Sequence, residues 1–167
     1  LICNLLDKEY SYYKKLGAEK KPELPEPFTA SRYEDAQRYQ NYSCSPVMEG
    51  FEPDTDAAEQ WSDPFKGGWT AHKKDSSIKF SVNGGIIMVQ YKKTINKPAP
   101  VAYAVIDGDR QNKVLLDANF DEDWGDLCCL EEIYSGKKGE HTVEIVIDTE
   151  GKEDSDFMLI SVIAANR

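Results

Sequence analysis

The sequence lacks the short motifs that mark most catalytic and nucleotide-binding sites. It contains no G-x-S-x-G, H-E-x-x-H or G-x-G-x-x-G pattern and no phosphate-binding loop. Only two histidines are present to act as a general base. We therefore do not expect this chain to carry out catalysis by itself.

The sequence also lacks a positive charge balance and a long apolar run. Lysine and arginine number 20 against 30 aspartates and glutamates, so the net charge is −10. This sign repels phosphate backbones and anionic membrane surfaces. The longest apolar runs, residues 85–89 and 158–165, are far shorter than the roughly 18 residues needed to cross a bilayer. We expect neither nucleic acid nor a membrane as a partner.

Cysteine is scarce and poorly placed for a metal site. The 4 cysteines form no C-x-x-C pair, and 2 histidines are too few to complete a zinc finger. Cys128 and Cys129 are neighbours in a predicted strand, where successive side chains point to opposite faces. They are expected to pack as small apolar residues instead of bonding each other, which favours a reducing compartment.

The N-terminal segment differs from the rest of the chain. The sequence starts at Leu1 inside a helical pattern, which suggests a fragment of a longer polypeptide. Apolar residues within 2–16 recur every three or four residues and predict one amphipathic helix. The proline-rich segment 20–27 has the composition of a stiff linker. Residues 1–27 are thus expected to be the closing helix and tether of a preceding domain, and residues 28–167 a domain of their own.

In the second segment the period of the apolar residues changes to two. Four runs alternate in this way: 78–82, 87–91, 101–105 and 141–147. Asn83-Gly84-Gly85, Asp107-Gly108 and Gly136 to Gly139 are interpreted as tight turns between strands. Residues 157–165 are apolar on both faces, as expected for a central strand. The pattern predicts an all-β fold, a two-layer antiparallel β-sandwich of jelly-roll-like type with a short N-terminal helix.

An acidic, aromatic segment, residues 120–126, lies between two predicted strands. Asp121, Asp123 and Asp126 are able to accept hydrogen bonds from hydroxyl groups, and Trp124 offers a flat ring for stacking. Loop carboxylates also suit Ca²⁺, although the spacing is not that of an EF-hand. Two interpretations stay open here, a solvated acidic loop and a loop that contacts a sugar or a cation.

The other tryptophans and the histidines are weaker candidates. Trp61 and Trp69 lie beside glycine, proline or acidic residues, a setting found in binding platforms and in plugs that close the end of a sandwich. The plug is favoured for these two, whereas both interpretations are open for Trp124. His72 is a candidate ligand contact but is more simply a surface histidine, and His141, at the start of a strand, is expected to be structural.

Six short runs carry a family resemblance: Phe65–Ala71, Val89–Thr94, Ala104–Asp109, Leu116–Asp121, Trp124–Asp126 and Gly139–Ile145. Together they resemble the β-sandwich domain that follows the catalytic domain in a group of bacterial SGNH/GDSL hydrolases. The resemblance covers Leu24 to about Ala165, so nearly all of the chain. It implies a sandwich like that of carbohydrate-binding modules.

The resemblance also implies a function for the parent protein. That protein is expected to hydrolyse esters, such as acetyl or acyl groups on carbohydrate, with a serine, histidine and aspartate of the preceding SGNH domain. The Gly-Asp-Ser and Asp-x-x-His blocks do not occur in this chain, so no catalytic role is transferred. The chain itself is then an accessory domain that binds carbohydrate or shapes the substrate cleft, with candidate ligand-binding residues Trp124, Asp121, Asp123, Asp126, Trp69 and His72.

Two alternatives remain beside this one. The first is a structural interdomain or protein-interaction sandwich that has no ligand of its own. The second is a self-contained hydrolase that uses aspartates and histidines of this chain. No cofactor is expected apart from the Ca²⁺ considered for the acidic segment.

Overall fold

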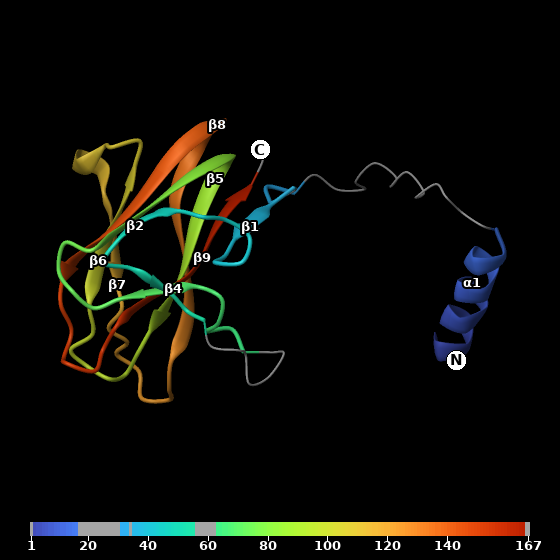
Figure 1. Ribbon diagram of the computed structural model, residues 1–167, viewed down its shortest axis with the longest axis horizontal. Helices are drawn as coiled ribbons and strands as arrows, with labels where there is room; N and C mark the ends of the chain where they lie inside the picture. The colour runs from blue at the N-terminus through green and yellow to red at the C-terminus, as the bar shows by residue number, and fades with distance from the viewer. Residues whose placement is uncertain (1, 17–30, 34, 56–62, 166–167) are drawn as a thin grey trace. The chain divides into compact units, whose positions relative to one another are not determined.

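The computed structural model describes residues 2–16, 31–33, 35–55 and 63–165 (Figure 1). The chain divides into two units, Leu1–Ala30 and Ser31–Arg167, which are described separately here. The predicted linker at 20–27 lies outside the described residues. Within the described ranges, no helix has both the length and the apolar character to span a membrane.

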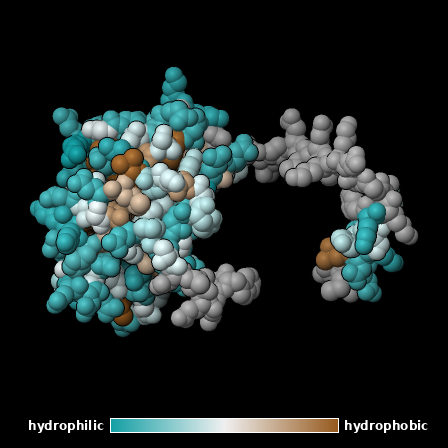
Figure 2. Space-filling model, viewed as in Figure 1, coloured by the Kyte–Doolittle hydropathy of each residue, from teal (hydrophilic) through white to brown (hydrophobic). Residues whose placement is uncertain are grey.

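The first unit contains the helix α1, Ile2–Leu16, which confirms the predicted helix. Several of its large apolar side chains are exposed, among them Leu5, Leu6 and Tyr10. Leucine and tyrosine on a helix surface are normally covered by another element, because apolar surface is costly to leave in water. Figure 2 shows apolar atoms among hydrophilic ones on this helix.

In the described residues of the second unit there are nine strands and one short helix. They are β1 Gln37–Tyr39, β2 Val47–Glu49, β3 Glu52–Pro53, β4 Trp69–Ala71, β5 Ser77–Lys93, β6 Val101–Ile106, the 3₁₀ helix η1 Arg110–Asn112, β7 Val114–Asp117, β8 Leu127–Thr149 and β9 Phe157–Ala165. The main order is β3-β4-β9-β5-β8-β6-β7, and in addition β1 pairs with β9 and β2 with β5. All pairings between these strands are antiparallel.

The two longest strands run through both layers of the sandwich. β5 and β8 pair from Ser77 with Val146 to Lys93 with Leu127. The start of β5 pairs with β2, and its later half pairs with β9. The later half of β8 pairs with β6, which in turn pairs with β7. One layer thus holds β2, β6 and β7 and the other β1, β3, β4 and β9, joined by the arched β5 and β8 (Figure 1). The predicted two-layer antiparallel sandwich is confirmed.

Two of the predicted turns are wrong. Asn83–Gly85 and Gly136–Gly139 lie inside β5 and β8, where Gly84 pairs with Gly139 and the register shifts between Gly84 and Ile86. A Cβ on Gly84 would lie 2.9 Å from the Ala165 carbonyl oxygen. Gly84 therefore marks a bulge at which β5 bends and the backbone of β9 approaches closely, a role that also selects glycine.

The core lies between the two layers. It is formed mainly by side chains of β5, β8 and β9, including Ile78, Phe80, Val82, Val89, Val143, Ile145, Ile147, Phe157, Leu159 and Val162. β9 has neighbours on both sides, which confirms its predicted central position. In β6 the small residues Ala102 and Ala104 are in the core, whereas Tyr103 lies on the other face, with Lys113 Nζ 3.5 Å from its ring centroid.

The expectation that Cys128 and Cys129 do not bond each other agrees with the structure, and the expected apolar packing is seen for Cys129. Cys128 and Cys129 are both free thiols in the structure. Cys129 packs against the core, so the preceding residue in the same strand faces the other way. Burial raises the pKa of the Cys128 thiol above its ordinary value, which keeps that thiol protonated and unreactive near neutral pH.

The Asp107-Gly108 turn is confirmed and is fastened by His141. Asp107 and Gly108 have φ of 51° and 76°, and the Asp109 N–H donates to the Ile106 carbonyl at 2.9 Å. Asp107 Oδ2 lies 2.7 Å from His141 Nδ1, and its Oδ1 accepts from the Thr142 N–H at 2.8 Å. His141 therefore ties the end of β6 to β8, as expected of a structural histidine.

This ion pair predicts a pH dependence of stability. The hydrogen bond to Asp107 raises the pKa of His141, and the same bond lowers the pKa of Asp107. The contribution of His141 to the free energy of unfolding is fully present below its ordinary pKa of about 6.5. It is lost as the pH rises through the raised pKa. The contribution of Asp107 to the free energy of unfolding is fully present above about pH 4. It is lost as the pH falls through the lowered pKa.

We expect His141→Gln to reduce the free energy of unfolding most between about pH 4 and pH 6.5, by about 0.5–1 kcal/mol, because half-exposed ion pairs are screened by solvent. Urea unfolding of both proteins at pH 5.5 and pH 9 measures this difference. A loss of equal size at both pH values would contradict the assignment of the ion pair.

Candidate functional site

Two loops at the ends of β5 and β7 form the setting of the predicted site. The partner loop, residues 94–100, leads from β5 to β6, and the acidic loop, residues 118–126, leads from β7 to β8. Thr94 N–H donates to the Ala118 carbonyl at 2.8 Å, and Phe120 N–H donates to the Thr94 carbonyl at 3.0 Å. These backbone bonds join the two loops at their bases.

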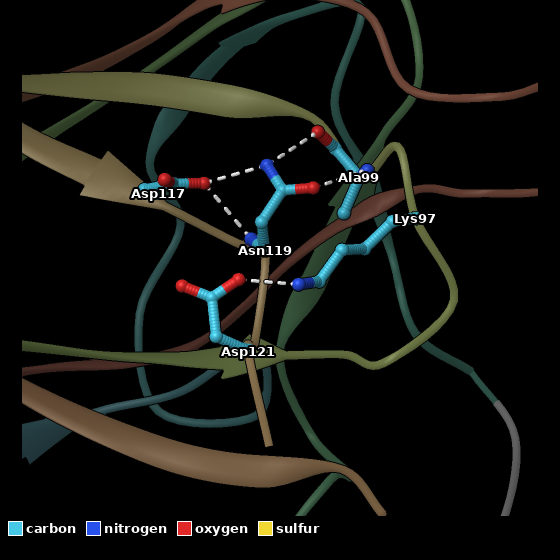
Figure 3. Close-up of polar contacts among 5 residues, drawn as sticks. All are labelled: Lys97, Ala99, Asp117, Asn119 and Asp121. Atoms are coloured by element: carbon cyan, nitrogen blue, oxygen red, sulfur yellow. Dashed lines mark hydrogen bonds and ion pairs between the residues drawn. The ribbon is translucent and has the colours of Figure 1, made fainter. Parts of the chain in front are cut away.

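Asn119 and Lys97 fix the two loops further (Figure 3). The Asn119 side chain accepts from the Ala99 N–H at 2.9 Å and donates to the Ala99 carbonyl at 3.2 Å. It also donates to Asp117 Oδ1 at 2.7 Å, and Lys97 Nζ forms an ion pair with Asp121. The Asn119 amide bonds to both the N–H and the carbonyl of Ala99, which holds the partner loop in one position. This platform, the partner loop, supports the acidic loop.

Trp124 stands out from this platform. Its side chain is 63% exposed, and its ring meets the Phe120 ring edge-on, with 5.1 Å between the centroids and 86° between the planes. The edge-to-face contact supports the indole while most of its surface stays accessible. The ring is thus available for stacking on a flat apolar face of a ligand.

The carboxylates of the acidic loop are accessible but do not converge. Asp121 is paired with Lys97, and the hydrogen bond from that lysine lowers the pKa of Asp121, which keeps it ionised as an acceptor. Asp126 Oδ2 lies 3.4 Å from Lys92 Nζ, and Asp123 is exposed. Within the described ranges, no three His, Cys, Asp or Glu side chains come together as metal ligands do. The Ca²⁺ expectation therefore has no geometric support at this loop.

Two other predicted ligand contacts lie elsewhere. Trp69 is only 1% exposed and packs edge-on against Phe80, with 5.1 Å between the centroids. A ring buried in this way offers no face to a ligand, so Trp69 is not the ligand contact proposed from the sequence, and its burial agrees with the favoured interpretation as a plug. His72 Nδ1 lies 3.2 Å from Asp156 Oδ1 beside a separate hollow of about 290 Å³. Trp61 lies outside the described residues.

Each histidine faces a carboxylate, and the question for catalysis is whether a nucleophile lies beside its ring. His72 faces Asp156, and His141 faces Asp107 and the Lys137 carbonyl. A serine hydrolase needs a hydroxyl within hydrogen-bonding distance of the imidazole. The contacts of these two side chains in the described structure do not include such a serine, which gives the self-contained hydrolase no geometric support.

Sequence reasoning missed a cavity of about 750 Å³ beside β1, β3 and β4. We call it the Tyr42 cavity; its lining includes Arg38, Gln40, Asn41, Tyr42, Asp54, Asp63, Lys66 and Gly67. These residues come from three separate segments and form no motif. The available signal was Tyr42 itself, a large aromatic residue within a polar turn.

Comparisons with known proteins bear on the origin of this domain. The sequence matches no family profile and no curated protein. Among solved structures it is similar to a two-domain esterase active on acetylated mannans, co-crystallised with mannopentaose, at 41% identity and a TM-score of 0.79. The match covers 97% of this chain and 45% of the esterase chain, so the chain spans less than half of that protein.

Two more distant structures share the fold. A family two carbohydrate esterase from Cellvibrio japonicus is 14% identical, with a TM-score of 0.53, and the match covers 80% of this chain and 34% of that one. A family 36 carbohydrate-binding module of a multidomain xylanase, from the hindgut metagenome of Trinervitermes trinervoides, is 10% identical, with a TM-score of 0.51 and coverages of 77% and 95%. This chain is therefore similar, over nearly all of its length, to part of a two-domain carbohydrate esterase, and it shares its β-sandwich fold with a carbohydrate-binding module.

Proposed function

We propose that this chain is a non-catalytic accessory domain of a bacterial SGNH/GDSL-type carbohydrate esterase and that it binds carbohydrate through the acidic loop. The observation that carries the proposal is the exposed Trp124 ring, held on a fixed loop in a chain that is 41% identical to part of a mannan-active esterase. Acetylated mannan is accordingly the proposed substrate of the parent protein.

The chemistry of the acidic loop supports a sugar ligand. The apolar face of a pyranose ring stacks on an exposed indole, and its hydroxyl groups need both donors and acceptors around that ring. Asp121 and Asp123 supply acceptors, and Lys97 supplies a donor on the partner loop. With positive and negative groups side by side, the loop suits an uncharged ligand better than an anion.

The same domain is proposed to contact the preceding catalytic domain. The exposed Leu5, Leu6 and Tyr10 of α1 form an apolar surface that needs a cover. We assign α1 to the end of that preceding domain, as the sequence pattern suggests. A sandwich placed next to the active site would also shape the substrate cleft, with or without sugar binding of its own.

Replacing Trp124 by alanine tests the binding function. We expect the affinity for mannopentaose to fall about 10–100-fold, because an aromatic hot spot is worth roughly 1.4–2.8 kcal/mol. Isothermal titration of the chain with mannopentaose measures the change. Tyr33→Ala is the matched control, because Tyr33 is another exposed aromatic residue and lies outside the acidic loop.

The outcomes separate the proposal from its alternative. Unchanged mannopentaose affinity in Trp124→Ala would show that the acidic loop is not the binding site. A wild-type chain that binds neither mannopentaose nor other oligosaccharides, with flat tryptophan fluorescence, would favour a structural interdomain sandwich without a ligand.

A further inference from the structure

The Tyr42 cavity is a built feature of the sandwich edge. Asn41 N–H donates to the Gly67 carbonyl at 2.9 Å, and the Asn41 side-chain amide donates to the carbonyls of Asp54 and Gly68 at 2.6 and 2.9 Å. The turn after β1 is thus bonded to the segment after β3 and to the segment before β4. Because these bonds join three separate parts of the chain, the parts of the cavity wall at residues 41, 54 and 67–68 are fixed relative to one another.

The Tyr42 ring is held in place and still accessible. Its hydroxyl donates to Gln40 Oε1 at 2.6 Å, and Gln40 is only 5% exposed, with its Nε2 donating to the Lys66 carbonyl at 3.2 Å. Gly67 has φ of 80°, and a Cβ there would lie 3.3 Å from the ring carbon Cε1. The ring therefore rests against glycine backbone, yet the side chain remains 78% exposed. This arrangement leaves a flat aromatic surface at the rim of the cavity.

The charges around the cavity are balanced. Arg38 and Lys66 are positive and Asp54 and Asp63 negative, so these four side chains carry no net charge. Lys66 Nζ lies 3.9 Å from Asp54 Oδ1. A site for a phosphate or carboxylate ligand would be lined by more positive than negative side chains. A balanced set of donors and acceptors beside an aromatic ring suits a neutral polyhydroxyl ligand.

We propose that the Tyr42 cavity is a second carbohydrate-binding site, specific for neutral oligosaccharides. It shares no lining residue with the acidic loop and is built from different elements, so the two sites bind independently. The inference rests on the proposed function only in taking sugar as the ligand class. A volume of about 750 Å³ is within the range of small-molecule sites and has room for two or more sugar units.

Nuclear magnetic resonance titration of the ¹⁵N-labelled chain with mannopentaose tests this second site. The side-chain amide of Asn41 and the backbone amide of Gly67 report on the cavity, and the indole N–H of Trp124 reports on the acidic loop. We expect both sets of resonances to shift, each with its own midpoint. Tyr42→Ala should weaken the midpoint at the cavity about 10-fold and leave the Trp124 midpoint unchanged, whereas Tyr42→Phe, which keeps the ring, should retain most of the affinity.

Each outcome decides between the two sites. Shifts at Trp124 alone would overturn the second site and leave the proposed function standing. Shifts at Asn41 and Gly67 that persist in Trp124→Ala would support the second site even if the acidic loop proved inactive. Cavity shifts that disappear in Trp124→Ala would overturn the inference, because they would then be secondary to binding at the acidic loop, and the absence of all shifts would overturn both proposals.

Discussion

Replacing Trp69 by alanine is expected to lower the free energy of unfolding by about 3–5 kcal/mol. Trp69 is 1% exposed and is among the largest fully buried side chains of the described structure. It begins β4, where it pairs with Pro53 of β3 on one side and Leu159 of β9 on the other. Removing the indole would leave a large cavity next to Phe80, and the flanking backbone has little freedom to close it.

Circular dichroism during urea unfolding measures this loss without relying on tryptophan fluorescence. Trp124→Ala is the matched control, because it removes the same side chain from an exposed site and should cost less than about 1 kcal/mol. Equal losses for the two variants would mean that Trp69 is not a core residue. A large loss for Trp69→Ala with unchanged mannopentaose affinity would also exclude it as a ligand contact.

The contrast between Trp69 and Trp124 shows where sequence reasoning ends. Both residues lie beside glycine and polar or charged neighbours, so local composition allows a plug or a binding platform for either one. What separates them is the strand pairing. Trp69 sits in a strand bonded to β9, more than 80 residues away in sequence, whereas Trp124 lies in a loop between strands. Long-range pairing of this kind leaves no local signal.

The long strands β5, β6, β8 and β9 were predictable because their signal is local, whereas the short strands β1 to β4 and β7 were not predicted. Val143 and Ile145 alternate with the polar Thr142 and Glu144 and are both buried, as a half-buried strand requires. Gly84 was misread for a physical reason. Glycine is selected both in tight turns and where two backbones come close, and only the pairing of β5 with β8 decides between these roles.

The two candidate sites differ in the same way. The acidic loop was recognised from a single run of acidic and aromatic residues. The Tyr42 cavity combines the turn after β1 with residues near 54 and 66, and Asn41 bonds to both of those segments. A site assembled from separate segments becomes visible only when the fold brings them together.

Replacing Gly68 by alanine is expected to cost at least about 3 kcal/mol of stability. A Cβ on Gly68 would lie 2.0 Å from the Leu159 carbonyl oxygen and 2.8 Å from Ile160 Cα. Both atoms belong to the backbone of the central strand β9, so no side-chain rotation relieves the overlap. The segment before β4 would have to move away from β9, and the pairing that seats Trp69 would be disturbed with it.

Gly139→Ala provides the control for the change from glycine to alanine itself. The Cβ at Gly139 would meet nothing closer than His141 Nε2 at 4.0 Å, so this variant should stay within about 1 kcal/mol of the wild type. Urea unfolding of both variants gives the comparison. Similar stability of the two would show that Gly68 does not lie against β9 as described here.

The same substitution links stability to the second binding site. The Gly68 carbonyl accepts from the Asn41 side chain at 2.9 Å and from the Asp54 N–H at 2.9 Å. Displacing Gly68 would therefore disturb the hydrogen bonds that position Asn41 and Asp54 in the lining of the Tyr42 cavity. Without urea, and at a temperature where Gly68→Ala remains folded, we expect the Asn41 side-chain resonances to move. We also expect the shifts that mannopentaose causes in these resonances to become smaller. The Trp124 indole resonance should keep its wild-type response, because the acidic loop is held by bonds of Asn119 to Ala99 and Asp117 and of Lys97 to Asp121.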